Sequence, residues 1–291
     1  MKNKSFVSKL FDGVNLTFLF IVFVATLCPF VYVAAVSLSD PYAVMQNKVT
    51  LYPIGFTLDS YKAVLANPAI WTGYKNTILY TVVGTAINLI LTTLMAYAIS
   101  KPTLYARKFF TLMVVFTMFF NGGIIPTYLV VKGLGMVDTM WAVILPTAVS
   151  TWNLMVMRTF FSGLPAELEE AAVIDGCNPL QVLFVIVIPL SSAIMVTIGL
   201  FYAVFHWNAY FAPLIYLNSK EKYPLQIFMQ QILITGETSF NSSIATENAS
   251  LTISDTVKYA TIMVAMLPIL MVYPFIQKYF AQGVMIGAVK G

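Results

Sequence analysis

Six long apolar runs constrain the fold of this chain more than any other feature of its sequence. They cover residues 15–38, 71–99, 109–131, 139–158, 184–211 and 257–280. Each is long enough to cross a bilayer, since a transmembrane helix needs about 20 predominantly apolar residues. Helix is the expected form because lipid offers the backbone no hydrogen-bond partner. The runs predict an all-α integral membrane protein with about six transmembrane helices in one transmembrane domain over residues 15–280.

The scarcity of charge supports the same conclusion. Only 10% of residues are charged, against about 25% in soluble domains, and the mean hydropathy is +0.83. No basic run interleaved with aromatics indicates a nucleic-acid partner. Cys28 lies in an apolar run and Cys177 in a polar loop, so we expect no disulfide between them. Two distant cysteines and the single His206 do not suggest a metal site.

The distribution of lysine and arginine indicates an orientation. Lys2, Lys4 and Lys9 precede the first run, and a second cluster occupies residues 101–108. By the positive-inside rule these segments are cytoplasmic. Residues 1–14 then form a cytoplasmic N-terminal segment and residues 281–291 a cytoplasmic tail. The first run is too long for a typical signal-peptide core, which favours a retained anchor helix.

The segments expected outside the membrane have different characters. Residues 39–70 carry several prolines and a glycine, which predicts an irregular or short-helical cap. Residues 212–256 include the polar stretch GETSFNSSIATENAS, for which we expect a flexible loop. Prolines inside the runs predict kinks, at Pro29, Pro126, Pro146, Pro268 and Pro274. Asn121-Gly122-Gly123 predicts a broken helix, serving either packing or a gate.

Missing motifs narrow the functional class. The runs carry no Asp or Glu in their middles, although ion-coupled transporters usually need such groups. The chain also lacks a phosphate-binding GxxxxGK[ST] loop, an HExxH and a GxSxG. We therefore expect neither enzymatic activity nor ATP binding on this chain, but a pore-forming subunit energised by other proteins.

The segment 159–183 is the most informative connection. Most of it belongs to the stretch LPAELEEAAVIDGCNPLQVLFVIVIPL, residues 164–190, which continues into the next apolar run. Pro165 suits a first helical turn, and Leu164, Leu168, Ala171 and Ala172 form one apolar stripe. Gly176 allows a turn, and Asn178 with Pro179 begins the next helix. The predicted short amphipathic helix suits docking into a groove of another protein. The alternative, a helix lying on lipid headgroups, would prefer basic residues to these acidic ones.

This loop resembles a known signature. Glu170-Ala171-Ala172, Gly176, Ile186 and Ile188-Pro189 match the EAA-x3-G-x9-I-x-LP motif of ABC importer permeases, with Ile188 where Leu is usual. The segments GYKNTILYTVVGTAINLILTTLMAYAIS, IIPTYLVVKGLGMVDTMWAVILP and FHWNAYFAPLIYL are similar to the carbohydrate-uptake branch. That branch includes the smaller maltose-transporter permease and multi-sugar or polysaccharide-fragment permeases.

The resemblance implies a type I permease fold and a set of partners. They are a second homologous permease, two ATPase subunits that bind ATP and Mg, an extracytoplasmic solute-binding protein, and a sugar or oligosaccharide. It implies a bacterial cell membrane location with both termini cytoplasmic. It also implies that a coupling helix contacts the ATPase through Glu167, Leu168, Glu170, Ala171, Ala172, Asp175 and Gly176. Glu170 would pair with a basic group, and the alanines would permit close approach. The C-terminal tail either reaches between the ATPases or is a frayed terminus.

A sugar pathway would use aromatic faces together with amide or hydroxyl groups. The candidates are Asn121, Tyr128, Trp152, Asn153, Tyr202, His206, Trp207, Asn208 and Tyr210. Interfacial anchoring or bonds between helices would explain the same residue types. A permease for another solute class, or a secondary transporter acting alone, remains an alternative function.

Overall fold

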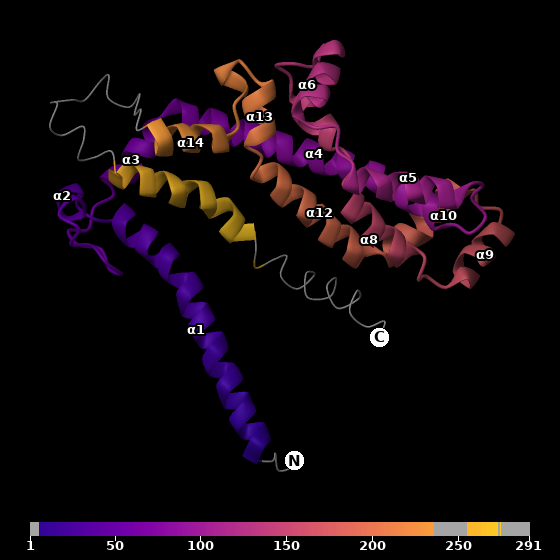
Figure 1. The fold of residues 1–291 in the computed structure, drawn as a ribbon, viewed down its shortest axis with the longest axis horizontal. Coiled ribbons are helices and arrows are strands. Elements are labelled where there is room, and N and C mark those ends of the chain that lie inside the picture. Colours follow the sequence, from indigo (N-terminus) through magenta and orange to yellow (C-terminus); the bar gives the residue numbers. More distant parts are fainter. Residues whose placement is uncertain (1–5, 236–254, 273, 275–291) are drawn as a thin grey trace. The chain divides into compact units, whose positions relative to one another are not determined.

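The computed structural model describes residues 6–235, 255–272 and 274, and every regular element in this part of the chain is a helix (Figure 1). The chain divides into two compact units. Unit 1 comprises residues 1–70 and 229–268, and unit 2 comprises residues 71–228 and 269–291. The polar stretch 236–250 and the tail 281–291, whose roles the sequence predicted, lie outside the described residues.

Unit 1 contains the first predicted span. Helix α1, Phe6–Ser37, begins inside the segment 1–14 that we expected to precede the span, because apolar residues already alternate there with the lysines. The helix continues through Pro29 without a break. Helices α2, Pro41–Met45, and α3, Asp59–Ala66, confirm the short-helical cap predicted over 39–70.

Hydrogen bonds hold the cap of unit 1 to the end of α1. The Ser37 hydroxyl lies 2.8 Å from the Tyr61 hydroxyl, and the Ser39 Oγ accepts the Ile54 N–H at 3.1 Å. Both serines are fully buried, so these bonds offset the cost of removing their hydroxyls from water. Unit 1 also contains most of α14, Leu225–Thr235, and of the helix Asp255–Val272, which passes through Pro268 unbroken.

Unit 2 begins with most of α4, Pro68–Ser100, a continuous helix of 33 residues. The elements that follow are shorter. They are α5 Arg107–Phe119, α6 Ile124–Gly133, α7 Met140–Ile144, η1 Leu145–Thr147, α8 Thr151–Phe161, α9 Ala166–Ile174, α10 Pro179–Val182, the π-helical η2 Leu183–Val187, α11 Ile188–Leu190, α12 Ser192–Trp207, α13 Phe211–Tyr216 and η3 Lys220–Lys222.

Three predicted spans are bent. The helix pair α5–α6 bends by 115°, the segments 140–147 and 151–161 by 51°, and the segments 179–190 and 192–207 by 87°. The described part therefore has three continuous helices long and apolar enough to cross a membrane, and six spans only if each bent pair counts as one.

The break predicted at Asn121-Gly122-Gly123 is confirmed. Gly123 has a φ of +83°, which favours glycine, and its N–H donates to the Asn121 Oδ1 at 2.9 Å. Pro126 lies in the first turn of α6, where its missing N–H costs nothing. It therefore helps α6 to begin rather than kinking a longer helix.

The remaining two bends have different origins. Pro146 lies in η1 at the 51° bend, as the sequence predicted. The 87° bend at Ser191 was not predicted. It follows Pro189, which cannot donate a backbone hydrogen bond, and the π-helical turn that widens the helix before it.

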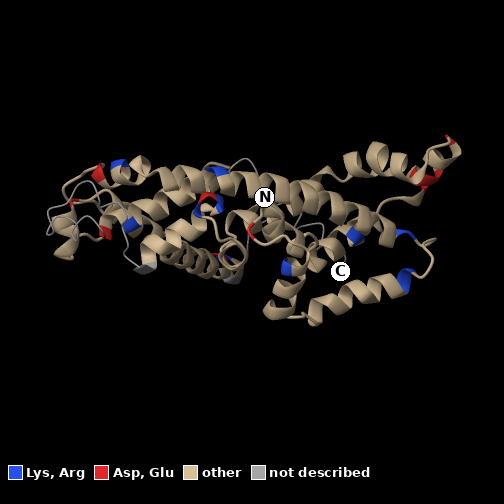
Figure 2. Cartoon of the chain, turned by 90° about the horizontal axis from the view of Figure 1, so that it is seen from above, with Lys and Arg blue, Asp and Glu red and all other residues tan. Residues whose placement is uncertain are grey.

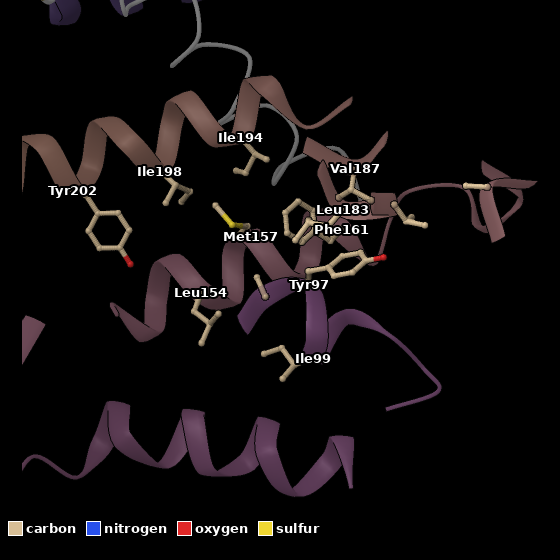
Figure 3. Close-up of a cluster of buried hydrophobic side chains, with 13 residues drawn as sticks. Tyr97, Ile99, Leu154, Met157, Phe161, Leu183, Val187, Ile194, Ile198 and Tyr202 are labelled. Atoms are coloured by element: carbon tan, nitrogen blue, oxygen red, sulfur yellow. The ribbon is translucent and has the colours of Figure 1, made fainter. Parts of the chain in front are cut away.

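Unit 2 has one principal core. Side chains of α4, α8, α10, η2 and α12 meet there, with Leu154, Met157, Leu183, Ile198 and Tyr202 almost fully buried (Figure 3). Ala172 of α9 belongs to the same core, so the loop helix is anchored to the bundle of unit 2.

Candidate functional site

The loop helix α9 begins and ends as its sequence dictates, with one difference. Pro165 immediately precedes the helix, whereas we expected it in the first turn. Gly176 has a φ of +86° and closes the helix, with its N–H donating to the Val173 carbonyl at 3.0 Å. Asn178 then caps α10 in a reciprocal capping box with Gln181. The predicted sequence of short helix, turn and capped helix is confirmed.

The apolar stripe predicted on α9 is not buried as a whole. Ala172 is 4% exposed and Leu164 is half-buried, but Leu168 and Ala171 are exposed. A helix of nine residues that rests on the core at one position leaves most of its circumference open. The result is a surface with apolar and acidic side chains together. Its members are Glu167, Leu168, Glu170, Ala171, Val173, Ile174, Asp175 and Gly176.

Two of these exposed residues were missed by the sequence reasoning. Val173 is 61% exposed and Ile174 is 85% exposed, which is unusual for large apolar side chains beside acidic ones. The acidic neighbours argue against contact with anionic headgroups. Such a mixed surface is suited to a protein partner.

An ion pair holds α9 in place, and the sequence analysis missed it as well. The Lys101 ammonium, just beyond the end of α4, contacts the Glu169 carboxylate, and both side chains are about three-quarters buried. The Lys101 Nζ also lies 4.1 Å from the centre of the Tyr97 ring. Glu169 precedes the buried Ala172 by three residues, so helical spacing places both on the inward face. The three-residue spacing of Glu169 and Ala172 is the sequence signal from which the inward position of Glu169 could have been predicted.

A cleft lies beside this ion pair. Its volume is about 650 Å³, and its walls come from the segment 100–107, the end of α8 and the loop helix. Glu169 and Glu170 both line it. Glu170 has no hydrogen-bond or ion-pair partner among the residues that the structure describes, so its carboxylate is available to a basic group.

The predicted pathway residues do not form one site. Asn121, Trp152 and Asn208 are exposed. The first two lie at helix breaks that are close together, because the hydroxyls of Thr117 and Thr151 are 3.2 Å apart. Asn121 lies four residues after Thr117, just beyond the end of α5, and Trp152 follows Thr151 directly. An amide and an indole are thus available on one exposed part of unit 2.

A second group of pathway candidates is buried and serves the fold. Asn153 is 6% exposed, and Tyr202 and His206 are 2% exposed. The Tyr202 hydroxyl accepts the Ser150 N–H at 3.0 Å and lies 2.7 Å from the Thr92 Oγ1. It therefore satisfies a backbone group that the bend before α8 leaves free.

The third group is aromatic. Tyr128 stacks on Tyr216, with ring centres 6.1 Å apart and planes 7° apart. The Trp207 ring centre lies 6.5 Å from that of Tyr74. Tyr210 is half-buried just before α13. The contacts of Tyr128 and Trp207 are ordinary aromatic packing between side chains of the protein.

A polar hub that the sequence analysis did not single out connects three segments of unit 2. The Asp138 carboxylate accepts the N–H groups of Asn218 and Ser219 at 2.9 and 3.0 Å, and the Lys222 ammonium at 2.8 Å. The Tyr80 hydroxyl of α4 donates to the Lys222 carbonyl at 2.8 Å. These bonds, led by that from Lys222, hold the pKa of Asp138 well below its usual range.

The hub and α9 contact α4 at two separate levels along its length. Tyr80 and Ser100 are 20 residues apart in one helix, which corresponds to about 30 Å. That length is about the thickness of the hydrocarbon core of a bilayer. Within the described ranges, no group of three His, Cys, Asp or Glu residues could hold a metal ion.

Comparison with known proteins gives a consistent answer. A family described as "Binding-protein-dependent transport system inner membrane component" matches residues 68–286. The polygalacturonan/rhamnogalacturonan transport system permease protein YtcP of Bacillus subtilis (strain 168) is 42% identical over 284 residues, which cover 98% of this chain and 99% of YtcP. Protein LplC of the same organism is 43% identical over 283 residues, 97% of this chain and 96% of LplC.

A solved structure agrees with these relatives. One chain from the crystal structure of a bacterial ABC transporter involved in the import of the acidic polysaccharide alginate has a TM-score of 0.87 and 35% identity to this chain, covering 96% of this chain and 100% of that one. The resemblance inferred from the EAA-type loop is confirmed. This chain therefore belongs to the binding-protein-dependent inner membrane components, the permease subunits of ABC transporters, and has their all-helical type I fold.

Proposed function

We propose that this chain is one of two permease subunits in an ATP-driven importer of oligosaccharides and that α9 docks into a groove of an ATPase subunit. The observation that carries the proposal is the exposed face of α9. It presents acidic and large apolar side chains beside a cleft, on a helix fixed to the bundle at Ala172 and Glu169. Movement of a docked partner would pass through these two contacts into α4.

Individual residues receive specific roles under this proposal. Glu170 pairs with a basic side chain of the ATPase, since its carboxylate is exposed. Ala171 permits close approach of the partner, whereas Ala172 packs into the core of the permease itself. Ile174 and Val173 enter an apolar part of the groove. Gly176 ends the helix so that only about two turns are presented.

The remaining parts of the importer follow from the same proposal. Two ATPases bind ATP and Mg on the cytoplasmic side, and a second homologous permease forms the other half of the pathway. A solute-binding protein delivers the sugar from outside a bacterial cell. ATP binding and hydrolysis then open the pathway alternately to the two sides, and no covalent chemistry occurs on this chain.

We further propose acidic oligosaccharides as the substrate class. YtcP is named for polygalacturonan and rhamnogalacturonan transport, and the structural neighbour is involved in the import of alginate. The exposed Asn121 and Trp152 supply an amide and an indole with which a sugar could interact.

Reconstitution tests this function. The chain would be expressed with its neighbouring permease, an ATPase and its binding protein, and placed in liposomes. Oligogalacturonides of defined length should stimulate ATP hydrolysis several-fold, and malto-oligosaccharides should not. Stimulation by a peptide or phosphate instead would favour a permease for another solute class. Solute uptake by the chain alone, without ATP, would overturn the importer proposal.

Glu170→Lys tests the docking surface. Reversal of this charge should repel the basic partner group, so we expect at least a tenfold fall in stimulated ATP hydrolysis and less ATPase co-purifying with the permease. Glu221→Lys is the matched control, because Glu221 is also an exposed acidic residue but lies on η3, away from α9 in the sequence. Unchanged ATPase recovery with Glu170→Lys would remove Glu170 from the docking surface.

A further inference from the structure

A second pocket of unit 2 lies between the start of α5 and the end of α8. Its volume is about 390 Å³, and it is lined by Arg107, Lys108, Thr111, Leu112, Val115 and Arg158. Half of these side chains are cationic. None of the three cations has a carboxylate partner within the described ranges, whose ion pairs involve other residues. A net charge of about three positive units therefore surrounds one small volume.

The two arginines are held close to each other. The Nε of Arg107 donates to the Ile99 carbonyl at 3.0 Å, and the Nε of Arg158 donates to the same oxygen at 3.3 Å. Each guanidinium has five N–H donors, so most of their donors are not used by this carbonyl. Two like charges converging on one oxygen repel each other, and an anion placed between them would remove that repulsion. Planar guanidinium groups match phosphate oxygens particularly well.

The pocket changes from polar to apolar along α5. Thr111 lies one turn after Arg107, and its Oγ1 is inaccessible to water and has no hydrogen-bond partner in the described part. Leu112 lies one turn after Lys108 and is 69% exposed, and Val115 extends the apolar wall. A ligand that fits this gradient has an anionic head and a hydrocarbon tail that follows the helix.

The level of the pocket in the membrane agrees with such a ligand. Helix α4 ends at Ser100, α5 begins at Arg107 and α8 ends at Phe161, so three helix ends of unit 2 coincide at the pocket. Arginine and lysine at the ends of membrane helices reach the headgroup region. Basic pockets between membrane helices at this level suit lipid phosphates.

We propose that this pocket binds one anionic phospholipid, with its phosphate between Arg107 and Arg158, Lys108 at the rim, and an acyl chain along Leu112 and Val115. A carboxylate of a partner protein would neutralise the arginines but leave the apolar wall unused. Free phosphate would do the same. The bound lipid would brace α5 against α8 next to the loop that carries Lys101, whatever solute is transported.

The test uses the full transporter complex in nanodiscs and in detergent. Native mass spectrometry would count the bound lipids, and thermal unfolding would be followed with phosphatidylglycerol, with phosphatidylcholine and with inorganic phosphate. Wild type should retain phosphatidylglycerol and be stabilised by it selectively. Each cation removed should weaken lipid binding about fivefold, equivalent to about 1 kcal/mol.

Variants separate charge from shape. Arg107→Gln with Arg158→Gln should abolish the preference for phosphatidylglycerol, and Arg158→Lys should keep part of it. Leu112→Trp changes no charge but fills the apolar wall, so it should also weaken binding, and it remains informative if the double variant fails to fold. Lys132→Gln, an exposed cation in the last turn of α6, is the control and should behave as wild type.

Several outcomes would overturn the proposal. They are the absence of any preference for anionic lipid in wild type, an undiminished preference in the double arginine variant, and a normal preference in Leu112→Trp. Equal stabilisation by inorganic phosphate would show a site for free phosphate rather than lipid. None of these readouts depends on sugar-stimulated ATP hydrolysis, so failure of the proposed function would be distinguished from failure of the lipid site.

Discussion

Gly84 shows how much one absent side chain can decide in a membrane helix bundle. A Cβ at this position would lie 2.5 Å from the Nε2 of His206, well inside contact distance. The His206 ring is 2% exposed, so it has no free space into which to move. The glycine therefore allows α12 to pack its only histidine against α4. Neither ring nitrogen of His206 has a hydrogen-bond partner among the described residues, so His206 meets α4 by packing and not by the hydrogen bond between helices that its sequence suggested.

Gly84→Ala should destabilise the protein by about 1–3 kcal/mol through overpacking. Thermal or denaturant unfolding in detergent measures this change. His206→Ala in the same chain should remove the clash, so the effects of the two substitutions should be far from additive. Gly133→Ala is the control, because a Cβ on this helical glycine would meet nothing within 4 Å. Equal effects at the two glycines would contradict the packing argument.

The contribution of the polar hub to stability should depend on pH through the carboxylate of Asp138. Its pKa is lowered, so the ionised carboxylate stabilises the fold above the ordinary aspartate pKa of about 3.9. That contribution is lost as pH falls from there through the lowered pKa. Asp138→Asn should be less stable than wild type by the same amount at pH 7 and pH 5, and the difference should narrow at pH 3. Asparagine tolerates the backbone φ of +61° at this position, so the comparison isolates the charge.

Asp59→Asn is the matched control for this pH series. The Lys62 bond also lowers the Asp59 pKa, but both side chains of that pair are 75% exposed and water screens them. We expect little change in stability at any of the three pH values. A wild-type advantage over Asp138→Asn that already narrows between pH 7 and pH 5 would contradict the lowered pKa of Asp138.

At the scale of elements, the bends between helices explain why several polar side chains are buried in unit 2. Each bend leaves backbone groups without helical partners, and side chains from neighbouring helices satisfy some of them. The Asn88 Nδ2 donates to the Thr147 carbonyl at 3.2 Å, and the Tyr202 hydroxyl accepts the Ser150 N–H. Polar residues in the spans of unit 2 thus stabilise the bend between η1 and α8. This role explains Tyr202 better than contact with a sugar.

Helix α9 depends on its ion pair, which leads to a test by charge exchange. Lys101→Glu or Glu169→Lys alone should loosen α9, so its amides should exchange hydrogen faster and stimulated ATP hydrolysis should fall. The double variant with Lys101→Glu and Glu169→Lys should recover most of the amide protection and most of the stimulated ATP hydrolysis, with a coupling energy of about 1 kcal/mol. Glu167→Lys is the control for amide exchange, since Glu167 is exposed on the same helix. Absence of recovery in the double variant would show that the pair does not hold α9.

At the scale of the whole molecule, charge is distributed as a membrane requires. Long stretches of helix carry no Lys, Arg, Asp or Glu (Figure 2). The described helices that could cross the membrane have no acidic residue in their middles, because Asp12 and Asp255 lie near helix ends. A proton pathway would need such groups. Under the proposed importer function, the energy for transport comes from ATP rather than from a proton gradient.

A protonophore should accordingly leave uptake unchanged in right-side-out vesicles loaded with ATP. Depletion of internal ATP should abolish uptake while the proton gradient is intact. Radiolabelled oligogalacturonide provides the measurement, and a known proton-coupled sugar carrier in parallel vesicles provides the control. Uptake that stops with the protonophore at constant ATP would show that the chain works as a secondary transporter.

The sequence by itself determined that lipid is the solvent of the apolar runs, that the chain is helical, and the family to which it belongs. Apolar runs without charges cannot face water, and lipid leaves helix as the way to satisfy the backbone. Local chemistry also predicted the turn at Gly176, the cap at Asn178 and the break at Asn121-Gly122-Gly123, because each depends on residues within a few positions of one another.

Only the tertiary structure decided the features that join distant segments. The pairing of Lys101 with Glu169, the hub around Asp138 and the contact of Gly84 with His206 each connect residues about 70 or more positions apart. No local periodicity records which helix faces which. The same reason explains why the stripe on α9 was predicted as a face but not as mostly exposed, and why the pathway candidates divided into exposed, buried and stacked groups. Hydropathy determines that a residue avoids water, whereas packing decides whether it meets lipid, another helix or a partner.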